Sequence, residues 1–206
     1  MQKNVLNKQD QWLIDNWRQA AQLEAAMISA REHYKALFTE VHKLVRLHHT
    51  HLDQLDVRLS ASDVKNWGGQ ILISDPRWPH LPNEERWRTG FYIWGVSLDE
   101  LASEREIEPA ASIWLSVKQN SGDKRLAVLR RQLSAKAQTV FKNRNLTWRD
   151  NDPDDDRICL CFPLPEGRTK LLRMAMSDDR AFVECMANHF RLLASFVPTI
   201  NKVLNK

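Results

Sequence analysis

Three cysteines and a histidine in the C-terminal third offer the side chains best suited to holding a metal ion. Cys159 and Cys161 lie two residues apart in a predicted strand, so both side chains point to the same face of a sheet. Cys185 and His189 lie four residues apart in a predicted helix, which places them on one helical face. Together the four could form a zinc site, although such sites usually use a Cys-x-x-Cys spacing. Because cysteine is also a common small buried hydrophobe, we favour core packing over metal ligation for this group.

An acidic stretch, residues 150–156, directly precedes the Cys-x-Cys pair. A helix-loop-helix calcium loop requires glycine at about the sixth position and a bidentate Glu at about the twelfth. Counted from Asp150, those positions hold Asp155 and Cys161, and the flanking elements are predicted strands. The stretch therefore predicts a solvated hairpin loop, in which Asp, Asn and Pro favour the turn and the charges discourage edge pairing. We expect the carboxylates to belong to the loop and the thiols to the sheet, without a shared metal.

The order strand, strand, helix between Phe91 and Val140 suggests a second chemistry, because it resembles PD-(D/E)XK nucleases. In those enzymes an Asp and an E-x-K strand hold a divalent metal, with the Lys beside the attacked phosphate. Asp99 and Glu100 follow the first predicted strand, and Lys118 follows the core of the second. Ser116 stands where the metal-binding Glu would be expected. The resemblance therefore implies a divergent or degenerate metal-dependent nuclease, which we keep as the alternative hypothesis.

Other catalytic and phosphate-binding motifs are absent from the sequence. It holds no G-x-S-x-G, no G-x-x-x-x-G-K-[ST] and no G-x-G-x-x-G, and its six glycines leave little room for phosphate-cradling loops. The histidine run HHTH at 48–51 has no carboxylate or cysteine pattern that would complete a metal site, and it predicts a polar helix end. We therefore expect no catalytic residues and no cofactor in the leading interpretation.

Composition limits the class of protein further. With 206 residues, of which 43% are hydrophobic, the chain can bury one sizeable core, or one core plus an extended element. Three cysteines form an odd and sparse set, which favours free thiols in a reducing compartment. No apolar run resembles a secretory signal or reaches the length of a membrane span. We expect a cytoplasmic protein without membrane contact.

A formal net charge of +4 is compatible with nucleic-acid binding without requiring it. Lys124, Arg125, Arg130 and Arg131 lie on the basic side of a predicted amphipathic helix. Direct binding of nucleic acid through this face is a third hypothesis, and a solvated basic surface is the simpler interpretation.

The first quarter of the chain predicts the element that would mediate association. Residues 9–57 contain no Gly or Pro and favour helix almost throughout, either as one continuous helix or as a helical hairpin. Apolar residues recur there in alternating steps of three and four, which is typical of a heptad seam that pairs with a copy or with a protein partner. The predicted seam consists of Met27, Ala30, Tyr34, Leu37, Val41 and Leu44.

The remaining elements predict an α+β protein. We expect two regions: a helical association segment at 1–59, and at 60–206 an α+β domain with a mixed or antiparallel sheet packed by two helices. A final helix is predicted after the cap at 177–179, and Pro198 is expected to end or kink it. Predicted strands lie at 70–74, 90–98, 111–119, 146–148, 158–164 and 170–176, and the first of the two helices lies at 124–141.

The segment from about Ala111 to Leu204 also resembles a known family. Its pattern runs ASIWLSV, LAVLRRQLSAKAQTVF, NLTW, RICL and FRLLASFVPTI. This pattern is similar to uncharacterised bacterial accessory domains that commonly follow PD-(D/E)XK nuclease domains. The family usually carries an Ile-Glu pair in the helix, where this chain has Gln138-Thr139-Val140. The resemblance implies a bacterial protein with a nuclease- or defence-associated partner, and it carries over no catalytic residues.

The leading interpretation is a non-enzymatic interaction protein. It would form a homo-oligomer or bind a protein partner through its N-terminal helix, and its partner could belong to a nucleic-acid-processing or defence system. The divergent nuclease with Asp99, Glu100 and Lys118 is the alternative.

Overall fold

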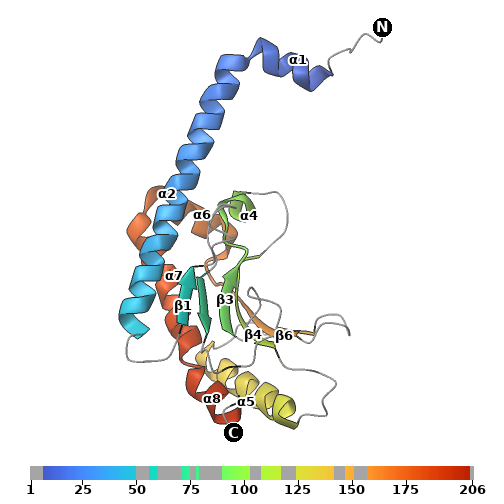
Figure 1. Cartoon of the computed structure of the whole chain (residues 1–206), viewed down its shortest axis with the longest axis vertical. Coiled ribbons are helices and arrows are strands. Elements are labelled where there is room, and N and C mark those ends of the chain that lie inside the picture. Colours follow the sequence, from blue (N-terminus) through green and yellow to red (C-terminus); the bar gives the residue numbers. More distant parts are fainter. Residues whose placement is uncertain are drawn as a thin grey trace.

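The computed structural model describes residues 7–49, 56–59, 71–74, 78, 90–102, 108–116, 124–141, 147–150 and 157–204 of the chain. Helices and strands occupy most of these residues, and Figure 1 labels them. In chain order they are α1 (Lys8–Asp15), α2 (Trp17–His49), β1 (Asp56–Leu59), β2 (Ile71–Ser74), β3 (Gly90–Trp94), α4 (Leu98–Ala102), β4 (Ala110–Ser116), α5 (Lys124–Val140), β5 (Thr147–Asp150), β6 (Arg157–Pro163), α6 (Gly167–Ser177), α7 (Asp179–Ala194) and α8 (Val197–Leu204).

The described strands form one six-stranded sheet in the order β1-β2-β3-β4-β6-β5. Each neighbouring pair is antiparallel, so the α+β prediction is confirmed in its antiparallel form. Five of the strands lie at predicted places. The sixth, β1, was not predicted, because the absence of Gly and Pro extended the expected helix to residue 57.

Alternation along the strands divides the sheet into two faces. One face carries Phe91, Ile113 and Leu160, which lie beside one another in register and belong to the main buried cluster. Tyr92 and the residues beside it in register, Ser112 and Cys161, point to the other face.

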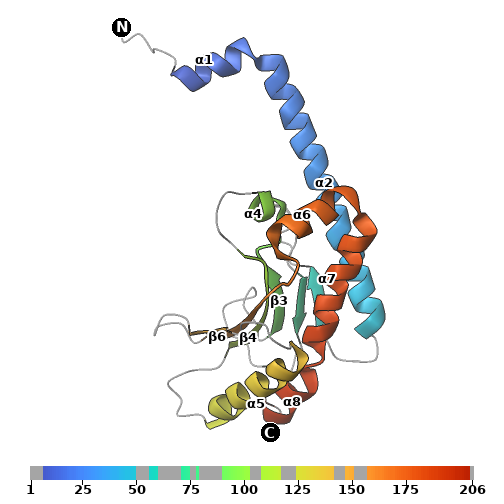
Figure 2. The ribbon, with the colours of Figure 1, turned by 180° about the vertical axis from the view of Figure 1, so that it is seen from behind.

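The helices pack on the first face. α7 contacts β3 and β4, and α2 lies along α7 and contacts β1 (Figures 1 and 2). The ring of Phe182 on α7 lies 5.5 Å from that of Tyr34 and 5.8 Å from that of Phe38, both on α2. At the other end of the sheet, Phe162 of β6 stacks on Phe141 at 4.3 Å, beside α5 and α8. The core therefore joins α2, α5, α7 and α8 to one sheet.

Two predicted helices are confirmed together with their apolar faces. On α5, Leu129, Leu133 and Ala137 are fully buried. The predicted cap of α7 is Asp178, whose Oδ1 accepts a hydrogen bond from the amide of Ala181 at 3.0 Å. Pro198 does not end this helix. α7 already ends at Ala194, and Pro198 lies in the first turn of α8, where a missing N–H costs little.

The segment predicted as a strand at 170–176 is helical and forms most of α6. That prediction is wrong. The sequence KLLRMAM contains no β-branched residue and consists of strong helix formers. Leu171 and Ala175 lie one turn apart and are fully buried, which fixes the inner face of α6. The apolar spacing alone did not separate strand from helix, whereas the helix propensity of these residues favours the helix that the structure shows.

The predicted long helix is continuous over the 33 residues of α2, a length of about 50 Å, with a break before it at Asn16. Its second half belongs to the core, since Tyr34, Phe38 and Val41 are buried. The residues of β1 were also assigned to the association segment at 1–59, and in the structure they form an edge strand of the sheet. A boundary at residue 59 therefore passes through the folded body, and the part of the chain that stands apart from it is shorter.

Candidate functional site

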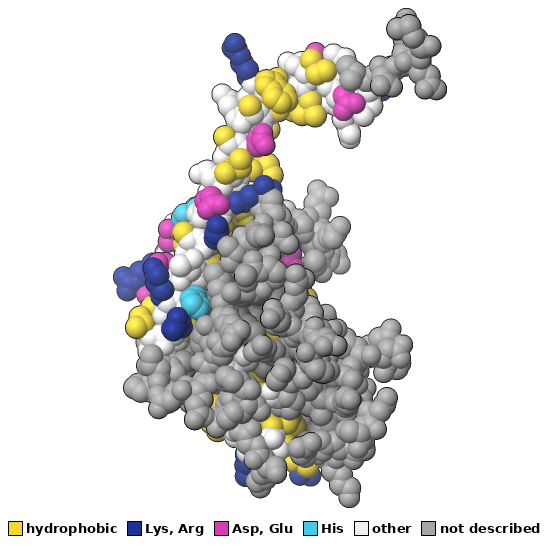
Figure 3. Space-filling model, in the orientation of Figure 1, with side chains coloured by type: hydrophobic (Ala, Val, Ile, Leu, Met, Phe, Trp, Pro, Cys, Tyr) yellow, Lys and Arg dark blue, Asp and Glu magenta, His cyan; other side chains and the backbone are white. Residues whose placement is uncertain are grey.

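The part that stands apart is the N-terminal arm, which we define as residues 7–30: α1 and the first part of α2. Both ribbon views show it projecting from the body (Figures 1 and 2). Within 7–30 every residue is exposed or half-buried. Seven large apolar side chains of the arm are between 42% and 68% exposed: Trp12, Leu13, Ile14, Trp17, Leu23, Met27 and Ile28. Figure 3 shows hydrophobic side chains, in yellow, along the projecting arm.

Local hydrogen bonds specify where the arm bends. α1 begins with a capping box in which Asn7 Oδ1 accepts from the amides of Gln9 and Asp10, at 2.9 and 2.8 Å. It ends at Asn16, whose backbone and side-chain N–H groups both donate to the carbonyl of Trp12, each at 2.9 Å. The amide of Ala20 then donates to the carbonyl of Asn16 at 3.0 Å and starts α2. The bend is therefore encoded by the Asn16 side chain.

One apolar stripe runs along α2 from the arm into the body. In the arm it consists of Ala20, Leu23, Met27 and Ala30, in steps of three and four. In the body the same stripe continues through residues that α7 and the sheet cover. Those residues are Tyr34, Leu37, Phe38, Val41 and Val45.

The predicted seam falls on this stripe, and in the structure some of its residues are buried while others are exposed. Tyr34, Leu37 and Val41 are buried in the chain's own core, and Leu44 is partly buried against it. Tyr34, Leu37 and Val41 therefore belong to the chain's own core, and Leu44 keeps part of its surface exposed. Ala30 is half-buried, and Met27 is 53% exposed. Leu23 and Trp17 were not assigned to the seam, although they continue the exposed apolar surface toward α1.

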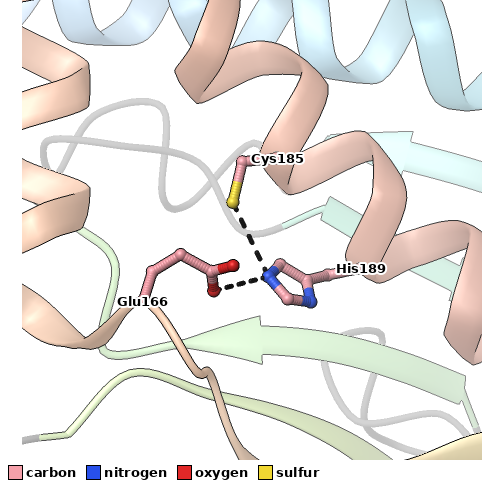
Figure 4. A group of neighbouring side chains, drawn as sticks. All are labelled: Glu166, Cys185 and His189. Atoms are coloured by element: carbon pink, nitrogen blue, oxygen red, sulfur yellow. Dashed lines mark hydrogen bonds and ion pairs between the residues drawn. The ribbon is translucent and has the colours of Figure 1, made fainter.

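A second cluster combines Glu166, Cys185 and His189 (Figure 4). The Nε2 atom of His189 lies 2.9 Å from Glu166 Oε2 and 3.7 Å from Cys185 Sγ. His189 is only 5% exposed, whereas Cys185 and Glu166 are half-buried. Their ligand atoms all lie within 4.8 Å of one another, and the described residues hold no other such group of three.

The structure does not unite the four residues of the proposed zinc quartet. Cys159 and Cys161 are buried, with their Sγ atoms 3.2 Å apart, and point to the sheet face opposite the helices. Cys185 and His189 lie on α7, in the helical layer. The preference for core packing agrees with the burial of the strand cysteines. Sequence reasoning missed Glu166, which lies 19 residues before Cys185 in a turn that tertiary packing brings under α7.

Of the three residues of the nuclease hypothesis, the described part of the chain includes the side chain of Glu100 alone, so the hypothesis stays a prediction. The side chain of Asp99 and the whole of Lys118 lie outside the described residues. Glu100 caps its own helix: its Oε2 accepts from the amide and hydroxyl of Ser97 at 3.0 and 2.7 Å, and its amide donates to Ser97 Oγ at 3.2 Å. This capping box gives Glu100 a structural role at the start of α4.

The basic face of α5 is only partly described. The side chains of Lys124 and Arg125 lie outside the described residues, Arg130 is half-buried and Arg131 is exposed. Lys136, on the same helix, donates to the carbonyl of Ser195 and lies 5.4 Å from the ring centroid of Phe196. At least one cation of α5 therefore contacts the turn between α7 and α8. The acidic residues 151–156 also lie outside the described part.

Comparisons with known proteins return nothing: no family model, no curated protein and no solved structure matches the chain. The resemblance to nuclease-associated accessory domains therefore stays a prediction. None of the described helices combines the length and apolar character needed to cross a membrane.

Proposed function

We propose that this protein is a non-enzymatic association module whose N-terminal arm pairs with the arm of a second copy. The observation that carries the proposal is the stripe of α2, which is packed in the body and continues uncovered into the arm. Leu37 and Val41 are 4% and 0% exposed, whereas Leu23 and Met27 on the same stripe are 60% and 53% exposed. Exposed apolar surface of this extent marks an interaction site in soluble proteins.

The area supports a stable pair. From their exposed fractions, the seven apolar side chains of the arm expose on the order of 800 Å² in total, an upper limit on what the arm can bury that matches the share of one partner in an interface of standard size. The two tryptophans among them, Trp12 and Trp17, are the residue type most enriched among binding hot spots.

The charge and pattern of the arm favour a second copy as the occupant. Residues 7–30 carry two cations, Lys8 and Arg18, against three anions, Asp10, Asp15 and Glu24, so two arms repel each other little. The arm stripe reads small, large, large, small: Ala20, Leu23, Met27, Ala30. An antiparallel pair placing Ala20 opposite Ala30 also places Leu23 opposite Met27, which makes a self-complementary twofold interface.

The bend at Asn16 fits the same register. In that register Asn16 of one copy lies opposite Tyr34 of the other, where the body of that copy begins. Tyr34 is fully buried beneath α7, so a straight partner helix could not continue past it. The straight part of the arm ends at Asn16, one residue before α2 begins. The proposal includes a cytoplasmic location, supported by three cysteines that form no disulfide.

The experiment compares two methionines of equal exposure. Met27 on the arm and Met176 on α6 are each 53% exposed. We expect light scattering after size exclusion to give a concentration-dependent dimer for the full chain. Met27→Ser should raise the dimer dissociation constant by at least tenfold, because two apolar contacts are lost per dimer. Met176→Ser, the matched control, should leave the dissociation constant unchanged.

Two results would contradict the proposal. The first is a wild-type chain that stays monomeric at every concentration up to the millimolar range. The second is a dimer that Met27→Ser and Met176→Ser weaken equally, because the interface would then lie elsewhere.

A further inference from the structure

We propose that Glu166, Cys185 and His189 bind a zinc ion through one sulfur, one nitrogen and one oxygen. The proposal is independent of the association of the arm, since the cluster lies in the body, between α7 and the turn before α6 (Figure 4).

The three candidate ligand atoms lie within 4.8 Å of one another, and two of their separations can be compared with those of tetrahedral zinc. Zinc binds thiolate sulfur at about 2.3 Å and imidazole nitrogen or carboxylate oxygen at about 2.0–2.2 Å, so tetrahedral ligands lie about 3.4–3.6 Å apart. The sulfur of Cys185 lies 3.7 Å from His189 Nε2, close to that range. The carboxylate oxygen of Glu166 lies 2.9 Å from the same nitrogen, so it would have to move away by about half an ångström.

Secondary structure holds two of the ligands in place. Cys185 and His189 are four residues apart on α7, so both side chains lie on one face of a helix whose inner residues are buried. α7 is anchored by its Asp178 cap and by contacts with α2, β3 and β4. Zinc would therefore meet a thiol and an imidazole that the fold has already brought together.

The third candidate ligand, Glu166, lies in the turn between β6 and α6, and the conformation of this turn directs its carboxylate toward His189. Glu166 occupies the N-cap position of α6, yet its side chain accepts no hydrogen bond from that helix. Its carboxylate contacts His189 instead. The next residue, Gly167, has a φ of +64°, a left-handed conformation that glycine adopts without strain, and its amide donates to the carbonyl of Leu164 at 3.2 Å. The turn thus ties the end of β6 to the carboxylate beneath α7.

Charge and burial also favour a divalent cation. A thiolate and a carboxylate balance the two positive charges of zinc, so the site would be neutral where His189 is 5% exposed. On binding, the Cys185 thiol releases its proton to solvent and its sulfur bonds to the metal, and the proton that His189 Nε2 shares with Glu166 is also released so that this nitrogen can bond to the metal. Three protein ligands leave the fourth tetrahedral position to water, because no fourth Cys, His, Asp or Glu joins the group within the described residues.

The competing explanation is a half-buried Glu166–His189 ion pair with a thiol beside it. Cobalt titration separates the two, because cobalt(II) replaces zinc in such sites and reports on its ligands by colour. We expect the metal-depleted full chain to take up one equivalent of cobalt(II), with visible tetrahedral bands and a thiolate-to-cobalt charge-transfer band in the near ultraviolet. Added zinc should displace the cobalt and remove both.

Variants assign the ligands. Cys185→Ser should abolish the charge-transfer band, and Glu166→Gln should weaken zinc binding at least tenfold, as measured by competition with a chromophoric chelator. Cys161→Ser, the control for a thiol on the other face of the sheet, should keep the band. Circular dichroism verifies that each variant is folded.

A measurement on the unaltered chain covers the case in which a variant fails to fold. Alkylation of the half-buried Cys185, followed by mass spectrometry, should slow at least tenfold when zinc is added, with buried Cys159 and Cys161 as internal references. The proposal is overturned if zinc leaves alkylation of Cys185 unchanged. It is also overturned if cobalt binds without a charge-transfer band, which would indicate a thiol-free site such as the histidine run at 48–51.

Discussion

The two halves of α2 carry one apolar stripe and lie in different surroundings. In the body half, Leu37 and Val41 are almost fully buried against α7 and the sheet. In the arm half, Leu23 and Met27 occupy equivalent positions on the helix and are more than half exposed. The spacing of apolar residues thus predicts that one face of the helix packs against another element. It does not report whether the cover comes from the same chain or from another one.

The body half also differs from the arm half in having a side-chain hydrogen bond to the sheet region, which we call the Tyr34 anchor. The hydroxyl of Tyr34 donates to the backbone carbonyl of Val96, two residues after the end of β3. The Tyr34 ring also packs 5.3 Å from that of Phe38. The body half is therefore fixed by directional contacts as well as by burial, whereas the described arm presents apolar side chains and local caps.

Truncating one leucine in each half gives the largest expected contrast. Leu37→Ala removes a buried side chain and should lower the free energy of unfolding by about 2–5 kcal/mol. Leu23→Ala, the same change on the same stripe, should alter it by less than about 0.5 kcal/mol, because the side chain is already 60% exposed. Urea denaturation measures both, at a protein concentration at which the chain is monomeric.

The change in helix propensity is the same in both variants, so it cancels from the comparison. Equal losses of stability would show that the arm is packed in solution and would remove the contrast between the halves. In the association assay the order should reverse, with Leu23→Ala weakening the dimer and Leu37→Ala acting only through unfolding.

The Tyr34 anchor sharpens the contrast with a smaller effect. Tyr34→Phe keeps the ring and leaves the carbonyl of Val96, a residue only 2% exposed, without this donor. We expect a loss of about 1–2 kcal/mol in the free energy of unfolding. A change in the free energy of unfolding below the error of the denaturation experiment would mean that apolar packing, without the hydrogen bond, holds the body half in place.

The same variant predicts a change in pH dependence. Burial, and after it the negative charge of Glu100, raise the pKa of Tyr34 well above its usual value of 10.0. Above about pH 10 the Tyr34 side chain of the unfolded chain loses its phenolic proton, while that of the folded chain keeps it. Alkali therefore favours unfolding. Tyr34 should therefore lower the free energy of unfolding by about 1.4 kcal/mol per pH unit, beginning near pH 10. Tyr34→Phe should reduce the slope of stability against pH above 10 by that amount, and an unchanged slope would contradict it.

Much of the fold could be predicted because its elements are encoded locally. The inner face of α5, the Asp178 cap and the alternation in β4 each follow from residues close in sequence. β1 and α6 could not be predicted in the same way. β1 becomes a strand by pairing with β2, and α6 was missed because the spacing of its apolar residues was given more weight than their helix propensity.

The candidate sites show the same limit. Cys185 and His189 were paired correctly because four residues make one helical turn. Their partner Glu166 is delivered by the turn at Gly167 and by the packing of α6 on α7, and no local pattern encodes either. The period of the apolar residues predicts the seam, yet the division of the stripe between core and exposed arm depends on where α7 begins, and Asp179 lies far along the chain.

The boundary between the two halves of α2 gives the smallest expected effect. His33 is one residue before the first fully buried position, and its Nε2 lies 3.0 Å from Oδ1 of Asp179, in the first turn of α7. Both side chains are largely exposed, at 43% and 58%, so their coupling should be at most about 0.5 kcal/mol and should vanish in high salt. A double-mutant cycle of His33→Gln and Asp179→Asn measures this coupling without the effect of Asp179 on its own helix. A coupling above about 1 kcal/mol that persists in salt would show that α7 already holds α2 at His33. The packed half would then begin one turn earlier, and Ala30 would belong to the body rather than to the arm.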